Sequence, residues 1–290
     1  MYTQVMLRLG VRFFENSARA FPPFLYVRLA QITGVILKIT GTNDALRKVK
    51  STRRIKPDTP IEILDWLGES FQILDLSRLS RILKGKDRAG ERMNERYKVD
   101  FLLQQNKPDL VLDIGANIGE FSLWCVKKNF KVIAFEPDSL AFKCLQFNLS
   151  TYENVEFRNY GLAASSGLKE FFIASTSADS SLISSNKEVS VKKIQTMTWI
   201  DYEKVSPLSP NVRTLLKMDA EGFEPEVLIG FGEQLRLISW LTIDVGTERN
   251  GERTEEAVRE ILEAQGFEEI YLAGPNILHA KNPQASREQL

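Results

Sequence analysis

Residues 113–120 (DIGANIGE) place a carboxylate and two glycines where the chain could turn around a ligand. The run follows the apolar residues LVL, which predict a buried strand, and it leads into an apolar stretch typical of a helix. Gly115 and Gly119 permit a tight turn and a close approach of the ligand, and the first N–H groups of the helix are free to bind it. We therefore predict a nucleotide-like ligand at this turn, with Asp113, Gly115, Asn117 and Gly119 as cofactor-binding residues.

The residue types around the turn favour one class of nucleotide cofactor. Asn117 stands where the pattern GxGxxG has its second glycine, which weakens the case for a pyrophosphate. Asp113 would repel phosphates but could pair with a cationic amino group, so S-adenosylmethionine fits better than NAD. Glu136 ends the next predicted strand, where an acidic residue accepts hydrogen bonds from ribose hydroxyls. Asn159, at the end of the third strand, either borders the adenine or is an ordinary turn residue.

A second acidic motif, residues 217–224 (KMDAEGFE), also follows a predicted strand and opens a helix. Its two carboxylates, Asp219 and Glu221, would face the reacting centre at the carboxyl edge of the sheet. Asp219 is our first choice for the base that removes a hydroxyl proton, with Glu221 as the second catalytic candidate. Either side chain could instead cap the helix that follows. Asp244 ends the next strand, and with Asp219 it could hold a divalent cation or simply be a solvated loop residue.

These motifs need a sheet whose strands end at one edge, and the sequence after Pro108 predicts such a sheet. Apolar runs alternate there with amphipathic stretches in the order βαβαβ, which indicates a doubly wound, Rossmann-like α/β sheet with helices on both faces. We assign this domain to residues 108–290. Strands are also predicted on both sides of a Ser-rich loop at residues 175–185, and FEEIYLA and NILHAKN predict a terminal antiparallel hairpin.

Residues 1–107 are predicted to form a helical, basic extension, with helices over residues 61–84 and 91–105. Residues 1–60 carry 11 basic and 3 acidic side chains, a net charge of +8, whereas residues 108–290 carry 18 basic and 27 acidic, a net charge of −9. An amphipathic helix in the first 20 residues could lie on an anionic membrane, or it could pack on the catalytic domain or on a second subunit of a homo-oligomer. Basic residues alone, without an aromatic-rich RNA module, give little support to nucleic acid as a partner.

Composition excludes several protein classes. With 43% hydrophobic and 26% charged residues, the chain is typical of globular proteins and not of disordered or multi-span membrane proteins. Two cysteines and one histidine provide neither a disulfide framework nor a zinc site. Charged residues interrupt each early apolar segment, so we predict neither a signal peptide nor a membrane-spanning helix, and we expect a cytoplasmic protein.

The motifs together resemble the FkbM family of S-adenosylmethionine-dependent methyltransferases. The similar pieces are VLDIGANIGEFS, VIAFEPD, NVEFRNYGLAASSG, SADSSLIS and LLKMDAEGFEPEVLIG, in the order of the family from about residue 109 to 281. The resemblance implies the class I methyltransferase sheet, S-adenosylmethionine as cofactor, and O-methylation of a sugar, glycan or natural-product hydroxyl. It also implies cofactor contacts at Asp113, Gly115, Asn117 and Glu136, and an acidic motif at Asp219 and Glu221 that faces the substrate. The sequence departs from the family's pattern at two places: Met197-Thr198 stands where the family usually has Leu-Asp, and Asp244 stands where the family often has a glutamate.

Three hypotheses of function follow. The first is a glycan O-methyltransferase. The second is a cofactor-binding scaffold without turnover, because a fold by itself does not establish catalysis. The third is an RNA-modifying methyltransferase that uses the basic N-terminal region.

Overall fold

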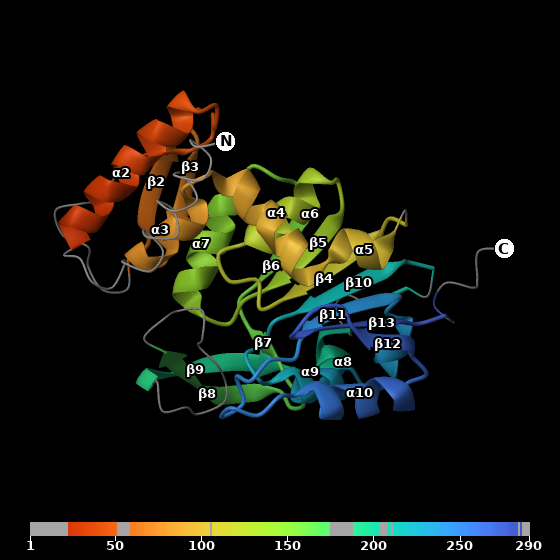
Figure 1. Cartoon of the computed structure of the whole chain (residues 1–290). Coiled ribbons are helices and arrows are strands. Elements are labelled where there is room, and N and C mark those ends of the chain that lie inside the picture. Colours follow the sequence, from red (N-terminus) through yellow and green to blue (C-terminus); the bar gives the residue numbers. More distant parts are fainter. Residues whose placement is uncertain are drawn as a thin grey trace.

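The computed structural model describes residues 23–50, 59–104, 106–174, 188–203, 208–209, 211–283 and 285. The predicted amphipathic helix of the first 20 residues, the basic residues of the segment 51–58 and the Ser-rich loop lie outside them. A large mixed sheet lies between two groups of helices (Figure 1). The first described residues form a small unit with an antiparallel sheet, which packs beside the helix at residues 139–149. Among the described helices, none is both long and apolar enough to cross a membrane.

The N-terminal unit contains strands, so the prediction of an entirely helical extension is wrong. The helix α2 (Pro23–Ile39) packs against β1 (Leu46–Val49), which pairs with β2 (Ile61–Asp65), and β2 pairs with β3 (Ser70–Ile73) in an antiparallel sheet. Buried residues alternate with half-buried ones along β2 and β3, the period of a strand with one buried face. The helical prediction for residues 61–84 missed this short alternation, and only η1 (Leu76–Arg78) and α3 (Leu79–Ile82) are helical there.

Two helices replace the single helix predicted for residues 91–105. The helix α4 (Lys86–Tyr97) ends where Lys98 adopts a left-handed backbone conformation with φ of 48°, and the N–H of Lys98 donates to the Asn94 carbonyl. The helix α5 (Val99–Leu103) follows and leads to the central sheet. Because of this break, Tyr97 is the last residue of α4.

The central sheet has seven strands in the order β12-β13-β11-β10-β4-β5-β6. They are β4 (Leu110–Ile114), β5 (Lys131–Phe135), β6 (Val155–Arg158), β10 (Thr214–Met218), β11 (Trp240–Asp244), β12 (Glu268–Leu272) and β13 (Ile277–Lys281). The strands from β6 to β11 are parallel, and β13 is antiparallel to both of its neighbours, which confirms the predicted hairpin. The chain moves outward from β4 in both directions, so the carboxyl end of β4 is the switch point where such sheets bind ligands.

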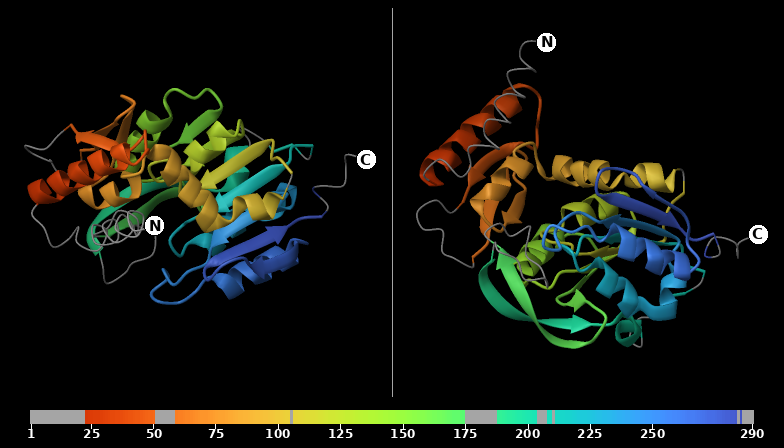
Figure 2. Two further views of the ribbon diagram at one scale, coloured as in Figure 1. Left: turned by 45° about the horizontal axis from the view of Figure 1, so that its top comes forward. Right: turned by 60° about the horizontal axis from the view of Figure 1, so that its bottom comes forward.

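Helices cover both faces of the sheet, as the sequence predicted (Figures 1 and 2). On one face, α4, α6 (Glu120–Lys127) and α7 (Ser139–Leu149) share an apolar core with the sheet. On the other face, α8 (Trp199–Glu203), α9 (Glu224–Phe231) and α10 (Glu255–Ala264) build a second core. A third sheet of order β7-β9-β8 follows β6 and contains β7 (Gly161–Leu162), β8 (Gly167–Ala174) and β9 (Glu188–Met197).

Candidate functional site

A cavity of about 330 Å³ opens at the carboxyl ends of β4, β5 and β10. Three predicted motifs contribute to its wall: the turn after β4, the end of β5 and the acidic loop after β10. Of the predicted residues, the cavity is lined by Gly115, Asn117, Glu136, Asp219 and Glu221. The structure thus brings together most of the residues that the sequence analysis selected, and it leaves Asp113, Gly119, Asn159 and Asp244 outside the cavity lining.

The glycine turn after β4 is held against the acidic loop. Gly115 has φ of 72°, and a Cβ atom at this position would lie 2.0 Å from the carbonyl oxygen of Asp219. Gly119 has φ of 90° and packs on α7, where a Cβ atom would lie 2.8 Å from a methyl of Leu145. Asn117 also has a left-handed backbone, with φ of 51°. Glycine is therefore required at Gly115 for close packing as well as for backbone conformation, since any side chain there would separate the two loops.

Glu136 connects the end of β5 to the glycine turn. One of its carboxylate oxygens accepts the N–H of Asn117 at 2.8 Å, and the other accepts the N–H of Asp138 at 2.8 Å. Burial raises the pKa of Glu136 to about 7, although these two hydrogen bonds favour the ionised form. Because each oxygen accepts only one backbone N–H, lone pairs remain for the hydroxyls of a ribose. The position fits the predicted cofactor contact.

Asn159 is exposed and does not line the cavity. Its side-chain amide donates to the carbonyl of Glu136 at 2.9 Å. This geometry agrees with the hypothesis that Asn159 is an ordinary turn residue rather than one that borders the adenine. Asn159 stabilises the backbone that carries Glu136.

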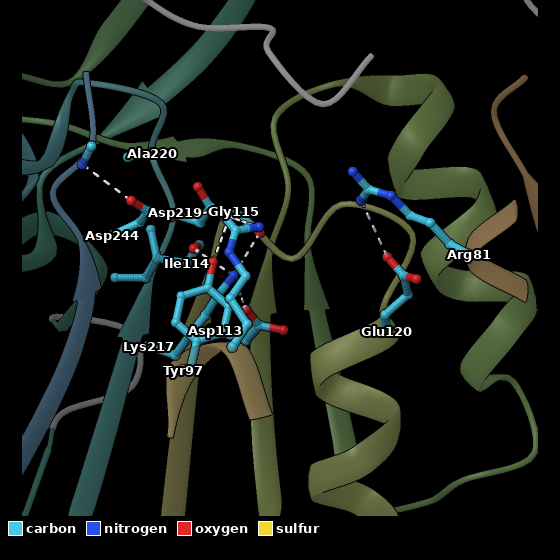
Figure 3. A network of polar contacts seen from close by, with 12 residues as sticks. Arg81, Tyr97, Asp113, Ile114, Gly115, Glu120, Lys217, Asp219, Ala220 and Asp244 are labelled. Atoms are coloured by element: carbon cyan, nitrogen blue, oxygen red, sulfur yellow. Dashed lines mark hydrogen bonds and ion pairs between the residues drawn. The ribbon is translucent and has the colours of Figure 1, made fainter. Parts of the chain in front are cut away.

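Asp113 is fully buried, and its carboxylate already has a cationic partner (Figure 3). The ammonium of Lys217 lies 3.0 Å from one oxygen, and the hydroxyl of Ser122 donates to the other at 2.6 Å. Lys217 also donates to the carbonyl of Gly115 at 2.9 Å. Asp113 was expected to pair with the amino group of a cofactor, but the ammonium that it binds belongs to Lys217. In the structure Asp113 thus positions the turn, and its direct contact with a cofactor stays a prediction.

Asp219 lines the cavity, and it is held by two residues of α4. The hydroxyl of Tyr97 donates to Oδ2 of Asp219 at 2.5 Å, and the guanidinium of Arg96 lies 3.6 Å from the same oxygen. Burial acts to raise the pKa of Asp219, but the charges of Lys217 and Arg96 and the Tyr97 hydrogen bond outweigh burial and lower it. Burial raises the pKa of the Tyr97 hydroxyl well above its usual value, so Tyr97 remains a donor. Asp219 is therefore an ionised hydrogen-bond acceptor at neutral pH.

Arg96 joins Asp219 to Asp244. Its guanidinium forms an ion pair with Asp244, whose carboxylate also accepts the N–H of Gly246 at 3.1 Å. The two carboxylates proposed as metal ligands thus share an arginine. Within the described residues, no group of three His, Cys, Asp or Glu side chains has a geometry that could hold a metal ion.

The acidic loop is fixed by Glu224, which the sequence analysis did not select. Its Oε1 accepts the N–H groups of Ala220 at 3.1 Å and Gly222 at 3.0 Å, and Thr254 donates to its Oε2. Burial raises the pKa of Glu224 to about 7. The N-cap residue of α9 is Phe223, which makes no side-chain capping hydrogen bond, so neither Asp219 nor Glu221 occupies the N-cap position. Glu221 lines the cavity in a left-handed conformation, with φ of 51°.

Part of the cavity wall comes from the segment that was predicted to be an extension. These residues lie on η1, α3 and α4, and they are Arg78, Arg81, Met93, Arg96 and Tyr97. The sequence analysis missed them because helical periodicity identifies an apolar face but does not tell which strand edge that face will meet. In the structure, Arg96 and Tyr97 directly precede the helix break at Lys98.

Comparison with known proteins identifies the family. Residues 113–269, more than half of the chain, match the model of the methyltransferase FkbM domain. The chain is 30% identical to the hexuronic acid methyltransferase AglP of Haloferax volcanii over 154 residues, which are 52% of this chain and 62% of that protein. The match thus spans less than two thirds of the length of this relative.

Solved methyltransferase structures are similar at low identity. One is the magnesium protoporphyrin IX methyltransferase ChlM of Synechocystis with bound S-adenosylmethionine, with 13% identity, a TM-score of 0.39, and coverage of 70% of this chain and 83% of that one. Another is the precorrin-6y C5,15-methyltransferase of Geobacter metallireducens, with 14% identity, a TM-score of 0.36, and coverage of 64% and 88%.

The family match agrees with the strand order and with the cavity. The matched segment contains the glycine turn, Glu136 and the acidic loop, and these surround one cavity at the switch point of the sheet. Gly115 and Asn117 line the cavity, and Glu136 beside them has acceptor capacity for a ribose, so the residues present fit the cofactor. The chain belongs to the family of the methyltransferase FkbM domain, and its central sheet has the doubly wound arrangement that the sequence predicted.

Proposed function

We propose that the protein methylates a hydroxyl oxygen of a sugar or glycan. The observation that carries this proposal is Asp219, an ionised carboxylate in the cavity wall that Tyr97 and Arg96 hold in place. The relative AglP, whose name describes it as a hexuronic acid methyltransferase, supports a sugar as the acceptor.

S-adenosylmethionine would supply the methyl group to the cavity. Asp219 would accept a hydrogen bond from the acceptor hydroxyl and orient its oxygen toward the methyl carbon. The S–CH3 bond of the cofactor would break as the new O–C bond forms, S-adenosylhomocysteine would leave, and the hydroxyl proton would pass to Asp219 and then to solvent. Because the pKa of Asp219 is lowered, the carboxylate is restored to its ionised form at neutral pH after each turnover.

The test is transfer of a labelled methyl group from S-adenosylmethionine to a panel of hexuronic acids, neutral hexosides and lipid-linked glycans. We expect Asp219→Asn to lower turnover at least about 100-fold while the affinity for S-adenosylhomocysteine changes by less than about 3-fold. Asp109→Asn is a matched control because Asp109 forms an exposed ion pair with Arg213 outside the cavity.

Each other outcome identifies a different function. An alkali-stable methyl product indicates an ether and supports the proposal, whereas an alkali-labile product indicates an ester at a sugar carboxylate and contradicts it. Cofactor binding without transfer to any acceptor would favour the scaffold hypothesis. Transfer to RNA instead of sugar would favour the RNA-modifying hypothesis.

We also propose that the N-terminal region contacts an anionic membrane at the cytoplasmic face. In support, α2 exposes apolar side chains, with Phe24, Ile32 and Ile39 at 69%, 56% and 79% exposure, and its neighbouring exposed residue Arg28 is basic. Sedimentation with vesicles tests this: we expect binding to phosphatidylglycerol vesicles that Ile32→Asp weakens. Equal binding to neutral phosphatidylcholine vesicles, or no effect of the substitution, would contradict it.

A further inference from the structure

Glu120 is a buried carboxylate in the cavity wall without an assigned role. It is 5% exposed and directly follows the glycine turn. Its Oε1 is buried and has no hydrogen-bond partner among the described residues. An unpartnered buried carboxylate oxygen is costly, so its presence in a cavity indicates a donor that arrives with a ligand.

Arg81 forms a long ion pair with Oε2 of Glu120 and leaves Oε1 without a hydrogen-bond donor. The guanidinium is 3.9 Å from Oε2 of Glu120, which is too long for a hydrogen bond (Figure 3). The side chain of Arg81 is 39% exposed and lines the same cavity. Arg78, which is 3% exposed, adds a second guanidinium to this part of the wall. The wall thus presents a carboxylate and a cationic group next to each other.

The cofactor of this family carries a matching pair of charges. The amino-acid end of S-adenosylmethionine has an ammonium and a carboxylate on one carbon atom. Asp113, the acid first expected to bind the ammonium, is fully buried and paired with Lys217. The ammonium therefore needs another acceptor in the cavity wall.

We propose that Glu120 and Arg81 bind the zwitterionic amino-acid end of S-adenosylmethionine, Glu120 by accepting hydrogen bonds from the ammonium and Arg81 by donating to the carboxylate. The proposal rests on the methyltransferase function described above and assigns a binding site that lies partly outside the matched family segment, since Arg81 precedes residue 113. The other available role for Glu120 is to stabilise the first turn of α6. That role affects stability but does not distinguish between ligands.

The experiment compares two ligands by calorimetry. S-adenosylhomocysteine carries the zwitterion, and 5′-methylthioadenosine shares its adenosine and sulfur but lacks the amino-acid end. We expect the wild type to bind S-adenosylhomocysteine more tightly. Glu120→Gln and Arg81→Gln should each weaken S-adenosylhomocysteine about 10- to 100-fold, the loss of a charge-assisted hydrogen bond, and change methylthioadenosine by less than about 3-fold.

The controls are Glu95→Gln and Arg88→Gln, which remove the members of an exposed ion pair on α4 outside the cavity. These variants should leave both affinities unchanged. An equal loss of both ligands, or no loss of either, in the Glu120 and Arg81 variants would overturn the proposal.

A second measurement keeps the proposal testable if a variant fails to fold. The decarboxylated analogue of S-adenosylhomocysteine retains the ammonium but lacks the carboxylate, so the folded wild type should bind it at least about 10-fold more weakly than S-adenosylhomocysteine. Equal affinity would remove the role of Arg81. If a folded wild type binds neither S-adenosylhomocysteine nor methylthioadenosine, the methyltransferase function itself fails together with this inference, which distinguishes that result from a failure of the zwitterion site alone.

Discussion

Lys217→Met should destabilise the protein much more than the loss of an ordinary surface charge. The side chains of Lys217 and Asp113 are 4% and 0% exposed and lie 3.0 Å apart, so the substitution leaves an unpaired charge inside the sheet edge. It also removes the donor to the Gly115 carbonyl. Removing one partner of a buried ion pair costs about 3–5 kcal/mol, so we expect a loss of this size in the free energy of unfolding.

The assay is urea denaturation at pH 7, with a double-mutant cycle. The double variant Asp113→Asn with Lys217→Met removes both charges, and we expect it to lose less stability than Lys217→Met alone, with a coupling energy of about 2 kcal/mol or more. Lys131→Met is the matched control because Lys131 forms an exposed pair with Glu156, and its loss should cost less than about 1 kcal/mol. If Lys217→Met costs no more than this control, or if the two substitutions at the buried pair are additive, our account of Asp113 is wrong.

Three further predictions concern the cavity wall. Burial raises the pKa of Glu136 to about 7, and ribose hydroxyls would favour its ionised form. Binding of S-adenosylhomocysteine should therefore release a proton near pH 6.5, and the affinity should increase as the pH rises to 8. Calorimetry in buffers of different ionisation enthalpy should detect this proton release in the wild type and not in Glu136→Gln. Gly115→Ala should abolish cofactor binding because its Cβ would collide with the backbone of the acidic loop. The control is Gly41→Ala, where φ is 99° and no atom lies near the added Cβ: it should lower the free energy of unfolding by only about 1–2 kcal/mol, measured by thermal unfolding, and leave cofactor binding intact. Treatment with EDTA should not lower methyl transfer, because Arg96 already pairs with both carboxylates proposed as metal ligands; a loss that magnesium restores would contradict this.

The sequence predicted the parts of the site that depend on local patterns. Every residue of β4, β10 and β11 is buried, so these strands appear as largely apolar runs, and the acidic residues at or just after their carboxyl ends necessarily meet at one sheet edge. The spacing of the glycines likewise predicted the turn after β4. These features follow from the chain direction in a parallel sheet and need no tertiary information.

The side-chain partners could not be predicted from the sequence. The chain has 38 basic and 38 acidic residues, and no pattern tells which of them pair. Arg96 reaches Asp244 across 148 positions, and Tyr97 reaches Asp219 across 122. The strands β2 and β3 were missed for a related reason, since strands of five and four residues show too few alternations to be distinguished from helices without knowledge of their packing.

The position of β13 has a consequence for the order of folding. This strand comes after all the others of the central sheet in the chain, yet it lies between β11 and β12. Its His279 lies 2.9 Å from the carbonyl oxygen of Tyr97, 182 positions earlier. At a synthesis rate of about 5–20 residues per second, the ribosome needs roughly 10–40 s to make this interval. Until β13 is made, β11 is the edge strand of the nascent sheet, and the Tyr97 carbonyl has only the Thr242 hydroxyl of β11, at 3.0 Å, as its partner from these strands.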